Sequence, residues 1–268
     1  MEKTTTKQTR YIKKTLILVF LLFSTYCFPA EKSKSDLASN LRSVIFTDYQ
    51  NFYSIKNFQY VFGEICISGI IANTNLDGNI QDWFQESVKN DRTNQISKIA
   101  KPIGNVYEPI SIYAGLTLLG SLTRHTSPGA MAYQFASKSL RAIVVGAPSV
   151  GFFQIVLGAS RPTEGGSKWH PFHDMNSVSG HAFIGAIPFV TISKMVDPVA
   201  LKTILYAGSA ATGLSRINDN KHYFSQVLAG WWFAYLAVNS LDNEKENKIR
   251  LCPTFSLNGW KMKLYVSL

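Results

Sequence analysis

Two histidines lie in polar segments that interrupt otherwise apolar stretches of this sequence. His181 ends the run Asn-Ser-Val-Ser-Gly-His, and His222 ends the run Ser-Arg-Ile-Asn-Asp-Asn-Lys-His. An apolar stretch follows each of them, and a third polar segment, Ser-Arg-Pro at 160–162, comes after another apolar stretch. If the apolar stretches are helices of one bundle, the three polar segments can meet at one of its ends.

The side chains in these segments suit phosphate chemistry. The guanidinium groups of Arg161 and Arg216 can each bind two oxygens of a phosphate. The Ser179 hydroxyl and the backbone N–H of Gly180, at the start of a predicted helix, add further donors. Two histidines can supply a nucleophile or base and an acid. The segments therefore predict phosphoryl transfer through a phosphohistidine.

The order and spacing of the three segments resemble the motifs of the type 2 phosphatidic acid phosphatase superfamily. That family carries K-x6-R-P, then P-S-G-H, then S-R-x5-H-x3-D. The matching residues are Arg161 and Pro162 in the first motif, Ser179, Gly180 and His181 in the second, and Ser215, Arg216 and His222 in the third. The matched span covers residues 154–226, and the apolar stretches around it resemble the helical bundle of the family.

The resemblance implies an all-α phosphatase that needs no cofactor and no metal ion. It implies that His222 attacks phosphorus, and that His181 protonates the leaving oxygen and then activates water. The residues implied to bind the equatorial phosphate oxygens are Arg161, Arg216, Ser179, Gly180 and Gln154. The implied substrate is a phosphomonoester or pyrophosphate, above all of a lipid, with a small soluble phosphoester as the other class.

Three positions depart from the family motifs. Gln154 stands in place of the lysine, Val178 in place of the proline and Gln226 in place of the aspartate. Because two helical turns separate Gln154 from Arg161, we expect both residues on the same side of one helix. Gln154 can still donate a hydrogen bond but lacks the positive charge. The candidates for supplying that charge are Lys168, Lys221 and His170.

Gln226 is the departure with the largest expected effect on the chemistry. Four residues after His222 on a helix, its amide oxygen can accept the ring N–H and hold the tautomer. It cannot supply the negative charge that stabilises an imidazolium, unless Asp219 or Asp174 takes over that role. The sequence therefore predicts that Gln226→Asp raises the rate. The alternative function is a catalytically weakened protein of the same fold that binds phosphate or lipid phosphate.

The segment Trp-His-Pro-Phe-His-Asp at 169–174 offers a second group of polar side chains. By residue type, His170, His173 and Asp174 are possible metal ligands. A solvated loop that lines the entrance of the site is the interpretation we prefer.

Composition limits the class of protein. The chain has 268 residues, of which 46% are hydrophobic and 16% charged, so it is not disordered. Its mean hydropathy is +0.02 and its formal net charge is +10. Basic character fits an anionic substrate or a membrane surface. The basic residues are scattered and form no nucleic-acid-binding motif, so we expect no nucleic-acid partner.

The N-terminus predicts export. The basic run 10–14 precedes an uncharged apolar run at 15–30, which is typical of a signal peptide or an N-terminal anchor over residues 1–30. We expect the rest of the chain in the periplasm or at the cell membrane facing it. Three cysteines are too few for a disulfide framework. If Cys27 is cleaved off, Cys66 and Cys252 either form one bridge or stay unpaired.

Helices are predicted for most of the remaining chain. A short surface helix begins at Ser35 or Asp36. Five apolar segments free of Asp, Glu, Lys and Arg follow at 109–123, 142–160, 182–193, 203–215 and 223–241. Small residues recur in them, as in helix contacts within membranes, so we expect a membrane-associated helical domain over 31–242. A linker and a β-hairpin around Asn258-Gly259 fill residues 243–268.

Overall fold

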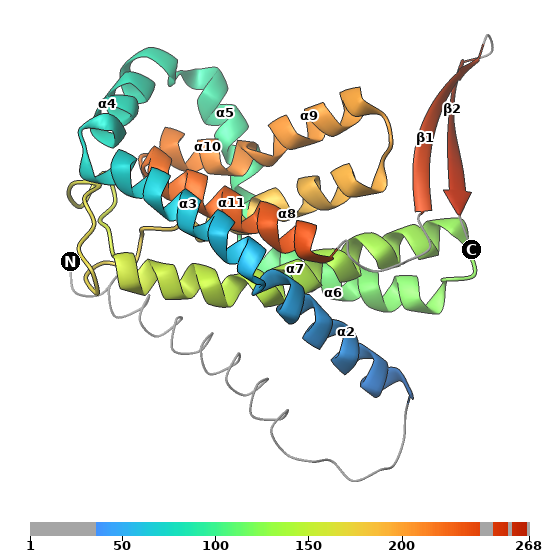
Figure 1. Ribbon diagram of the computed structural model, residues 1–268. Coiled ribbons are helices and arrows are strands. Elements are labelled where there is room, and N and C mark those ends of the chain that lie inside the picture. Colours follow the sequence, from blue (N-terminus) through green and yellow to red (C-terminus); the bar gives the residue numbers. More distant parts are fainter. Residues whose placement is uncertain (1–35, 242–248, 257–258, 267–268) are drawn as a thin grey trace. The chain divides into compact units, whose positions relative to one another are not determined.

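A computed structural model of the chain describes residues 36–241, 249–256 and 259–266 (Figure 1). The chain divides into two units, Met1–Ser43 and Val44–Leu268. The first unit is described only from residue 36, where helix α2 begins, and the features below belong to the second unit. The predicted signal or anchor segment at 1–30 lies outside the described residues.

The regular structure in the described part of the chain is helical, except for two strands near its C-terminal end, and a long loop over residues 158–179 joins α7 to α8. The elements are α2 (Asp36–Phe52), α3 (Ile55–Asn73), α4 (Leu76–Trp83), the π-helix η1 (Phe84–Val88), α5 (Asp91–Ala100), the 3-10 helix η2 (Lys101–Gly104), α6 (Tyr107–Leu122), α7 (Ser127–Leu157), α8 (Gly180–Met195), α9 (Val199–Ser209), α10 (Ala211–Asn218), α11 (Phe224–Ser240), β1 (Ile249–Ser256) and β2 (Gly259–Val266). The predicted all-α body is confirmed.

Polar side chains define where several of these helices begin. The Ser54 hydroxyl accepts from the Asn57 N–H at the start of α3, and Thr126 accepts from the Gly129 N–H at the start of α7. Each side chain satisfies one of the backbone donors that a helix leaves unpaired in its first turn. The predicted segment at 203–215 is instead two helices, α9 and α10, because the chain turns at Ala210.

Helix α7 ends earlier than the sequence predicts. Gly158 has a φ of 55°, and a Cβ atom there would lie 2.1 Å from the His170 carbonyl oxygen. Only glycine fits this left-handed turn without strain. The helix therefore stops at residue 157, and Arg161 lies beyond its end. The expectation that Gln154 and Arg161 share one side of a single helix is wrong.

Helix α8 is the centre of the core. It packs against α7, α9, α10 and α11, and most of its side chains are buried. The large core side chains that α8, α10 and α11 contribute include Phe183, Ile187, Val190, Ile217, Phe233 and Val238. Among the described helices, α7 is the one that is long and apolar enough to cross a membrane, with 28% of its most apolar stretch buried.

Strands β1 and β2 pair antiparallel, and Phe255 of β1 lies opposite Trp260 of β2. Residues 257–258, which include Asn258 of the expected turn, lie outside the described residues. The type of turn therefore stays a prediction.

Helices α8 and α11 approach closely where their first turns meet. A Cβ atom at Gly230 of α11 would lie 2.3 Å from the Ser179 carbonyl oxygen and 3.1 Å from the Ala182 Cβ. A Cβ atom at Gly213 of α10 would lie 2.4 Å from the Val227 Cγ1. Glycines therefore let three helices meet at the end that carries the polar segments.

We predict that Gly230→Ala destabilises the protein by about 1–3 kcal/mol, because the added methyl group overpacks the contact with Ser179. The matched control is Gly151→Ala within α7, where a Cβ atom would meet nothing within 4 Å. That change should stabilise by about 0.5–1 kcal/mol, since alanine favours a helix. Thermal melting of both variants measures the difference. Equal melting temperatures would contradict the close contact.

Candidate active site

Gln226, in the first turn of α11, contacts all three polar segments. Its backbone carbonyl accepts from the Ser179 N–H at 2.8 Å. Its side-chain Nε2 donates to the Ser160 carbonyl at 2.8 Å, and its Oε1 lies 2.8 Å from His222 Nδ1. Gln226 is buried, with 1% of its surface exposed. One residue thus joins the chain beside Arg161, the start of α8 and the His222 ring.

These bonds also determine the tautomer of His222. The Tyr223 N–H, which can only donate, lies 3.2 Å from Gln226 Oε1, and the Ser160 carbonyl can only accept. Both partners require the same orientation of the Gln226 amide. The His222 Nδ1 that faces the amide oxygen therefore carries the proton. The lone pair of a neutral His222 ring is left on Nε2, which is where a nucleophile needs it.

The loop between Arg216 and His222 explains the spacing of the third segment. The Arg216 carbonyl accepts from the Lys221 N–H at 2.9 Å and from the His222 N–H at 3.3 Å. The reversal passes through Asn220, whose φ is 55°, a conformation that asparagine tolerates better than most residues. The loop therefore returns the chain to Arg216 and places both functional side chains at the same end of α10.

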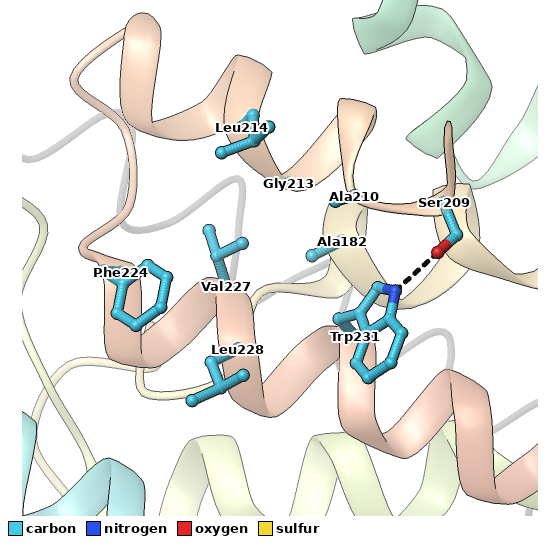
Figure 2. A pocket seen from close by; sticks show the side chains of 9 residues that line it. All are labelled: Ala182, Ser209, Ala210, Gly213, Leu214, Phe224, Val227, Leu228 and Trp231. Atoms are coloured by element: carbon cyan, nitrogen blue, oxygen red, sulfur yellow. Dashed lines mark hydrogen bonds between the residues drawn. The ribbon is translucent and has the colours of Figure 1, made fainter. Parts of the chain in front are cut away.

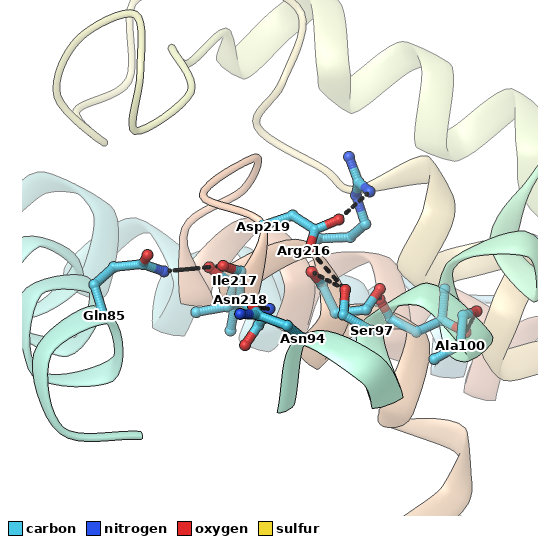
Figure 3. A network of polar contacts seen from close by, with 10 residues as sticks. Gln85, Asn94, Ser97, Ala100, Arg216, Ile217, Asn218 and Asp219 are labelled. Carbon is cyan, nitrogen blue, oxygen red and sulfur yellow. Dashed lines mark hydrogen bonds and ion pairs between the residues drawn. The ribbon is translucent and has the colours of Figure 1, made fainter. Parts of the chain in front are cut away.

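Arg216 is held in place by a polar network between α10 and α5 (Figure 3). Its Nη1 lies 3.6 Å from Asp219 Oδ2, and the Ser97 hydroxyl donates to Asp219 Oδ1 at 2.7 Å. The Asn218 amide donates to Asn94 Oδ1 at 2.9 Å. Although buried, Arg216 Nε and Nη1 have no hydrogen-bond partner in the described part of the chain. A guanidinium with two buried donors that make no hydrogen bond is suited to an anionic ligand.

Arg161, in the loop after α7, is the second arginine of the candidate site. Its Nε donates to Asn176 Oδ1 at 3.1 Å, and its Nη1 lies 3.7 Å from Glu164 Oε1. Burial is the main factor that lowers the pKa of Arg216, and the charge of Arg161 lowers it further. The two guanidinium groups are therefore close enough for their charges to interact.

Both histidines of the site are neutral at neutral pH. Burial lowers the pKa of His222 to about 3, and the charges of Arg216 and Arg161 lower it too. The hydrogen bond that the ring donates to Gln226 acts in the opposite direction and raises the pKa. Burial, together with nearby positive charge, lowers the pKa of His181 to about 4. Nearby positive charge that disfavours imidazolium also favours the binding of an anion.

The second segment forms the start of α8. Ser179 is buried, and its hydroxyl accepts from the Ala182 N–H at 3.3 Å as a helix cap. Gln154 donates from Nε2 to the Val178 carbonyl at 2.7 Å, and a Cβ atom on Gly180 would lie 3.8 Å from the same nitrogen. The Gln154 amide thus supports the turn before α8, and one of its two N–H bonds is used there.

Other side chains that the sequence offered are engaged elsewhere. Asp174 Oδ2 accepts from the Ser160 hydroxyl at 2.7 Å, and Asp219 pairs with Arg216, so neither replaces Gln226 at the ring of His222. His173 Nδ1 lies 3.0 Å from the Pro171 carbonyl. Within the described ranges, no group of three or more His, Cys, Asp or Glu side chains could hold a metal ion.

Sequence reasoning missed two residues near the site. Lys101 of η2 is close enough for its charge to lower the pKa of His181. Asp77 of α4 accepts from the Ser225 N–H at 2.9 Å and so caps the first turn of α11. Both come from segments far along the chain from the motifs, and no local pattern connects them to His181 or Gln226. The fold alone brings them together.

An apolar cavity lies behind the first turns of α8 and α11 (Figure 2). It measures about 130 Å³, and the side chains lining it include Ala182, Leu214 and Val227. Trp231 closes one side, where its Nε1 donates to the Ser209 hydroxyl at 2.7 Å. Ala182 and Val227 directly follow His181 and Gln226 in the sequence, so apolar packing supports both site residues from behind.

Comparison with known proteins agrees with this site. The family model of the PAP2 superfamily matches residues 133–241, a range that contains all three motifs and helices α8 to α11. A search of curated proteins and a search of solved structures each found no match. The match and the motifs within it show that residues 133–241 of the chain belong to the type 2 phosphatidic acid phosphatase (PAP2) superfamily.

Proposed function

We propose that this protein is a phosphatase that hydrolyses a phosphomonoester or pyrophosphate through a phosphohistidine on His222. The observation that carries the proposal is the pair of buried Arg216 donors that make no hydrogen bond, near a neutral ring whose Nε2 keeps its lone pair. Arg161 adds a second guanidinium to the same site. This combination fits a tetrahedral oxyanion that is attacked by a nitrogen nucleophile.

In the first step, a bond forms between His222 Nε2 and phosphorus as the bond from phosphorus to the leaving oxygen breaks. The leaving oxygen takes a proton from His181. A bound phosphate dianion favours this, because its negative charge opposes burial and the nearby positive charges, which lower the pKa of His181 to about 4. The Nδ1 proton stays on His222, held by the amide oxygen of Gln226.

In the second step, water attacks phosphorus and gives its proton to His181. The bond between phosphorus and Nε2 breaks, its electron pair returns to the ring, and inorganic phosphate leaves. Arg161, Arg216 and the Gly180 N–H bind the equatorial oxygens in both steps, at the start of α8 where backbone donors favour anions. Ser179 contributes as the cap of α8, and Gln154 can donate its second N–H.

We also propose that the enzyme is exported and associates with a membrane. Helix α7 has the length and apolar composition of a membrane span. Large apolar side chains are exposed on α3 and α6, among them Phe58, Phe62, Leu118 and Leu122. A large apolar surface of this kind suits contact with lipid. A lipid phosphate held in the same membrane is therefore the substrate we favour over a soluble ester.

We predict that His222→Ala lowers hydrolysis by at least about 10³-fold, because it removes the attacking nitrogen. Phosphate release is measured on a lipid monophosphate, a lipid diphosphate and p-nitrophenyl phosphate. Rapid quenching with labelled substrate should also trap an acid-labile phosphoprotein in the wild type and none in the variant.

The control for His222→Ala is His125→Ala, since His125 is exposed in the loop before α7. This control should keep full activity. Undiminished activity of His222→Ala would overturn the mechanism. A folded wild type that binds phosphate but hydrolyses none of the three substrates would support the alternative of a binding protein.

We expect Gln226→Asp to have the opposite effect from the one that the sequence predicts. Aspartate is one methylene shorter and has no N–H, so the Ser160 carbonyl would lose its donor at a buried position. An unsatisfied buried group of this kind costs about 1–3 kcal/mol. Because the lost bond also holds the residue that positions His222, we expect kcat to fall by about tenfold, which corresponds to about 1.4 kcal/mol of activation free energy.

The measurement is kcat of Gln226→Asp, with thermal melting to verify folding. Gln95→Asp on the exposed face of α5 is the control for the substitution itself and should match wild type. A folded Gln226→Asp enzyme that is faster than wild type would show that the missing charge, rather than the amide bonds, limits the reaction.

A further inference from the structure

A row of polar side chains runs along α4 and the π-helix η1. Its members, Asp77, Gln81 and Gln85, follow one another at intervals of four residues, the spacing that places side chains on one side of a helix. Asp77 and Gln81 are buried, with 0% and 4% of their surface exposed, whereas Asp82 of the same helix is exposed. Buried polar side chains need hydrogen-bond partners, and the partners of this row lie between residues 217 and 225, within the third motif.

Asp77 caps the first turn of α11 through both of its carboxylate oxygens. Oδ1 accepts from the Ser225 N–H at 2.9 Å, and Oδ2 accepts from the Ser225 hydroxyl. Tyr223 stands at the N-cap position of α11, where Ser, Thr, Asp or Asn is usual, so a carboxylate from another helix supplies the cap. Ser225 directly precedes Gln226, and Asp77 therefore holds the turn from which Gln226 reaches His222.

Gln81 and Gln85 hold the loop on the other side of His222. Gln81 Nε2 donates to Asn220 Oδ1 at 2.6 Å and to the Ile217 carbonyl at 3.3 Å. Gln85 Nε2 donates to the same carbonyl at 2.7 Å (Figure 3). Asn220 is the left-handed residue at which the chain reverses toward His222. The two glutamines therefore hold the reversal that leads into His222.

The contacts of α4 thus lie on both sides of His222. This residue comes two positions after Asn220 and three before Ser225, between the two segments that α4 holds. A nucleophile must stay aligned with phosphorus, and a displacement of about 1 Å can cost about a hundredfold in rate. Helix α4 lies outside residues 133–241, the range that the family model matches, so that match assigns it no role.

We propose that α4 orients His222 and that Asp77 and Gln81 are positioning residues for phosphoryl transfer. This inference rests on the proposed function. Both side chains act through other residues: Asp77 acts through Ser225 and Gln226, and Gln81 acts through the loop that precedes His222. The loss of either side chain should therefore slow the chemical step.

A kinetic test replaces Asp77 in two ways, on the substrate that the wild type hydrolyses fastest. Asp77→Ala removes both bonds to Ser225, so we expect kcat to fall by about tenfold or more and KM to change less than about threefold. Asp77→Asn should stay within about threefold of the wild-type kcat, because its amide can accept from the Ser225 N–H and donate to the hydroxyl. Asp82→Ala, on the exposed face of α4, is the matched control and should equal the wild type.

A spectroscopic test separates positioning from a loss of stability. Nitrogen NMR of histidine-labelled protein reports the protonation of both His222 nitrogens without any substrate. At a temperature where Asp77→Ala is fully folded, we expect a second His222 form protonated at Nε2, because Gln226 no longer holds the ring in one orientation. Asp77→Asn and Asp82→Ala should show the single wild-type form, protonated at Nδ1.

Gln81→Met is a second variant, and it carries the test if Asp77→Ala does not fold. Methionine is similar in length but cannot donate to Asn220 or to the Ile217 carbonyl, so kcat should fall by about tenfold. Its control is Gln95→Met on the exposed face of α5, which should equal the wild type.

The outcomes separate the positioning role from the proposed function. Wild-type kcat and a single His222 form in folded Asp77→Ala and Gln81→Met would overturn the inference and leave the proposed function intact. Equal losses of kcat in Asp82→Ala and Gln95→Met would overturn it as well. A wild type that hydrolyses no substrate, together with a second His222 form in Asp77→Ala, would refute the proposed function and support the positioning role.

Discussion

The site depends on the buried amide of Gln226. The amide has a donor end and an acceptor end. Its Nε2 donates to the Ser160 carbonyl, and its Oε1 accepts from the Tyr223 N–H, so both partners require the same orientation of the amide. The position of the proton on His222 follows from that arrangement. A carboxylate at this position would hold the ring but could not donate to Ser160. The amide therefore links the start of the loop that carries Arg161 to His222, the nucleophile that we propose, in a way that an aspartate cannot.

Packing brings the amide to its partners. Helix α7 must stop at Gly158 for the chain to reach Ser160 and Arg161, and α11 must approach α8 closely at Gly230 for the Ser179 N–H to reach the Gln226 carbonyl. Asp77 caps the first turn of α11 from a separate helix. Small residues and one buried carboxylate thus position side chains that are themselves far apart in sequence.

Part of this site could be predicted from the sequence, because motif residues lie at helix ends and helix ends follow composition. The Gln226 contact with His222 follows from a spacing of four residues on a helix. The position of Arg161 could not be predicted from spacing, since one left-handed glycine moved it off α7. Lys101 could not be found at all, because its nearness to His181 depends on how η2 packs against α8 and on no local pattern.

The proton on His222 is the most direct test of this account. Nitrogen NMR of histidine-labelled protein, with the His222 signals assigned by their loss in His222→Ala, reports the state of each ring nitrogen. We expect a neutral ring, protonated at Nδ1 and bare at Nε2, from pH 8 to pH 5, because its pKa is lowered to about 3. A His222 ring protonated at Nε2, or one that becomes doubly protonated in that range, would contradict the central role of Gln226.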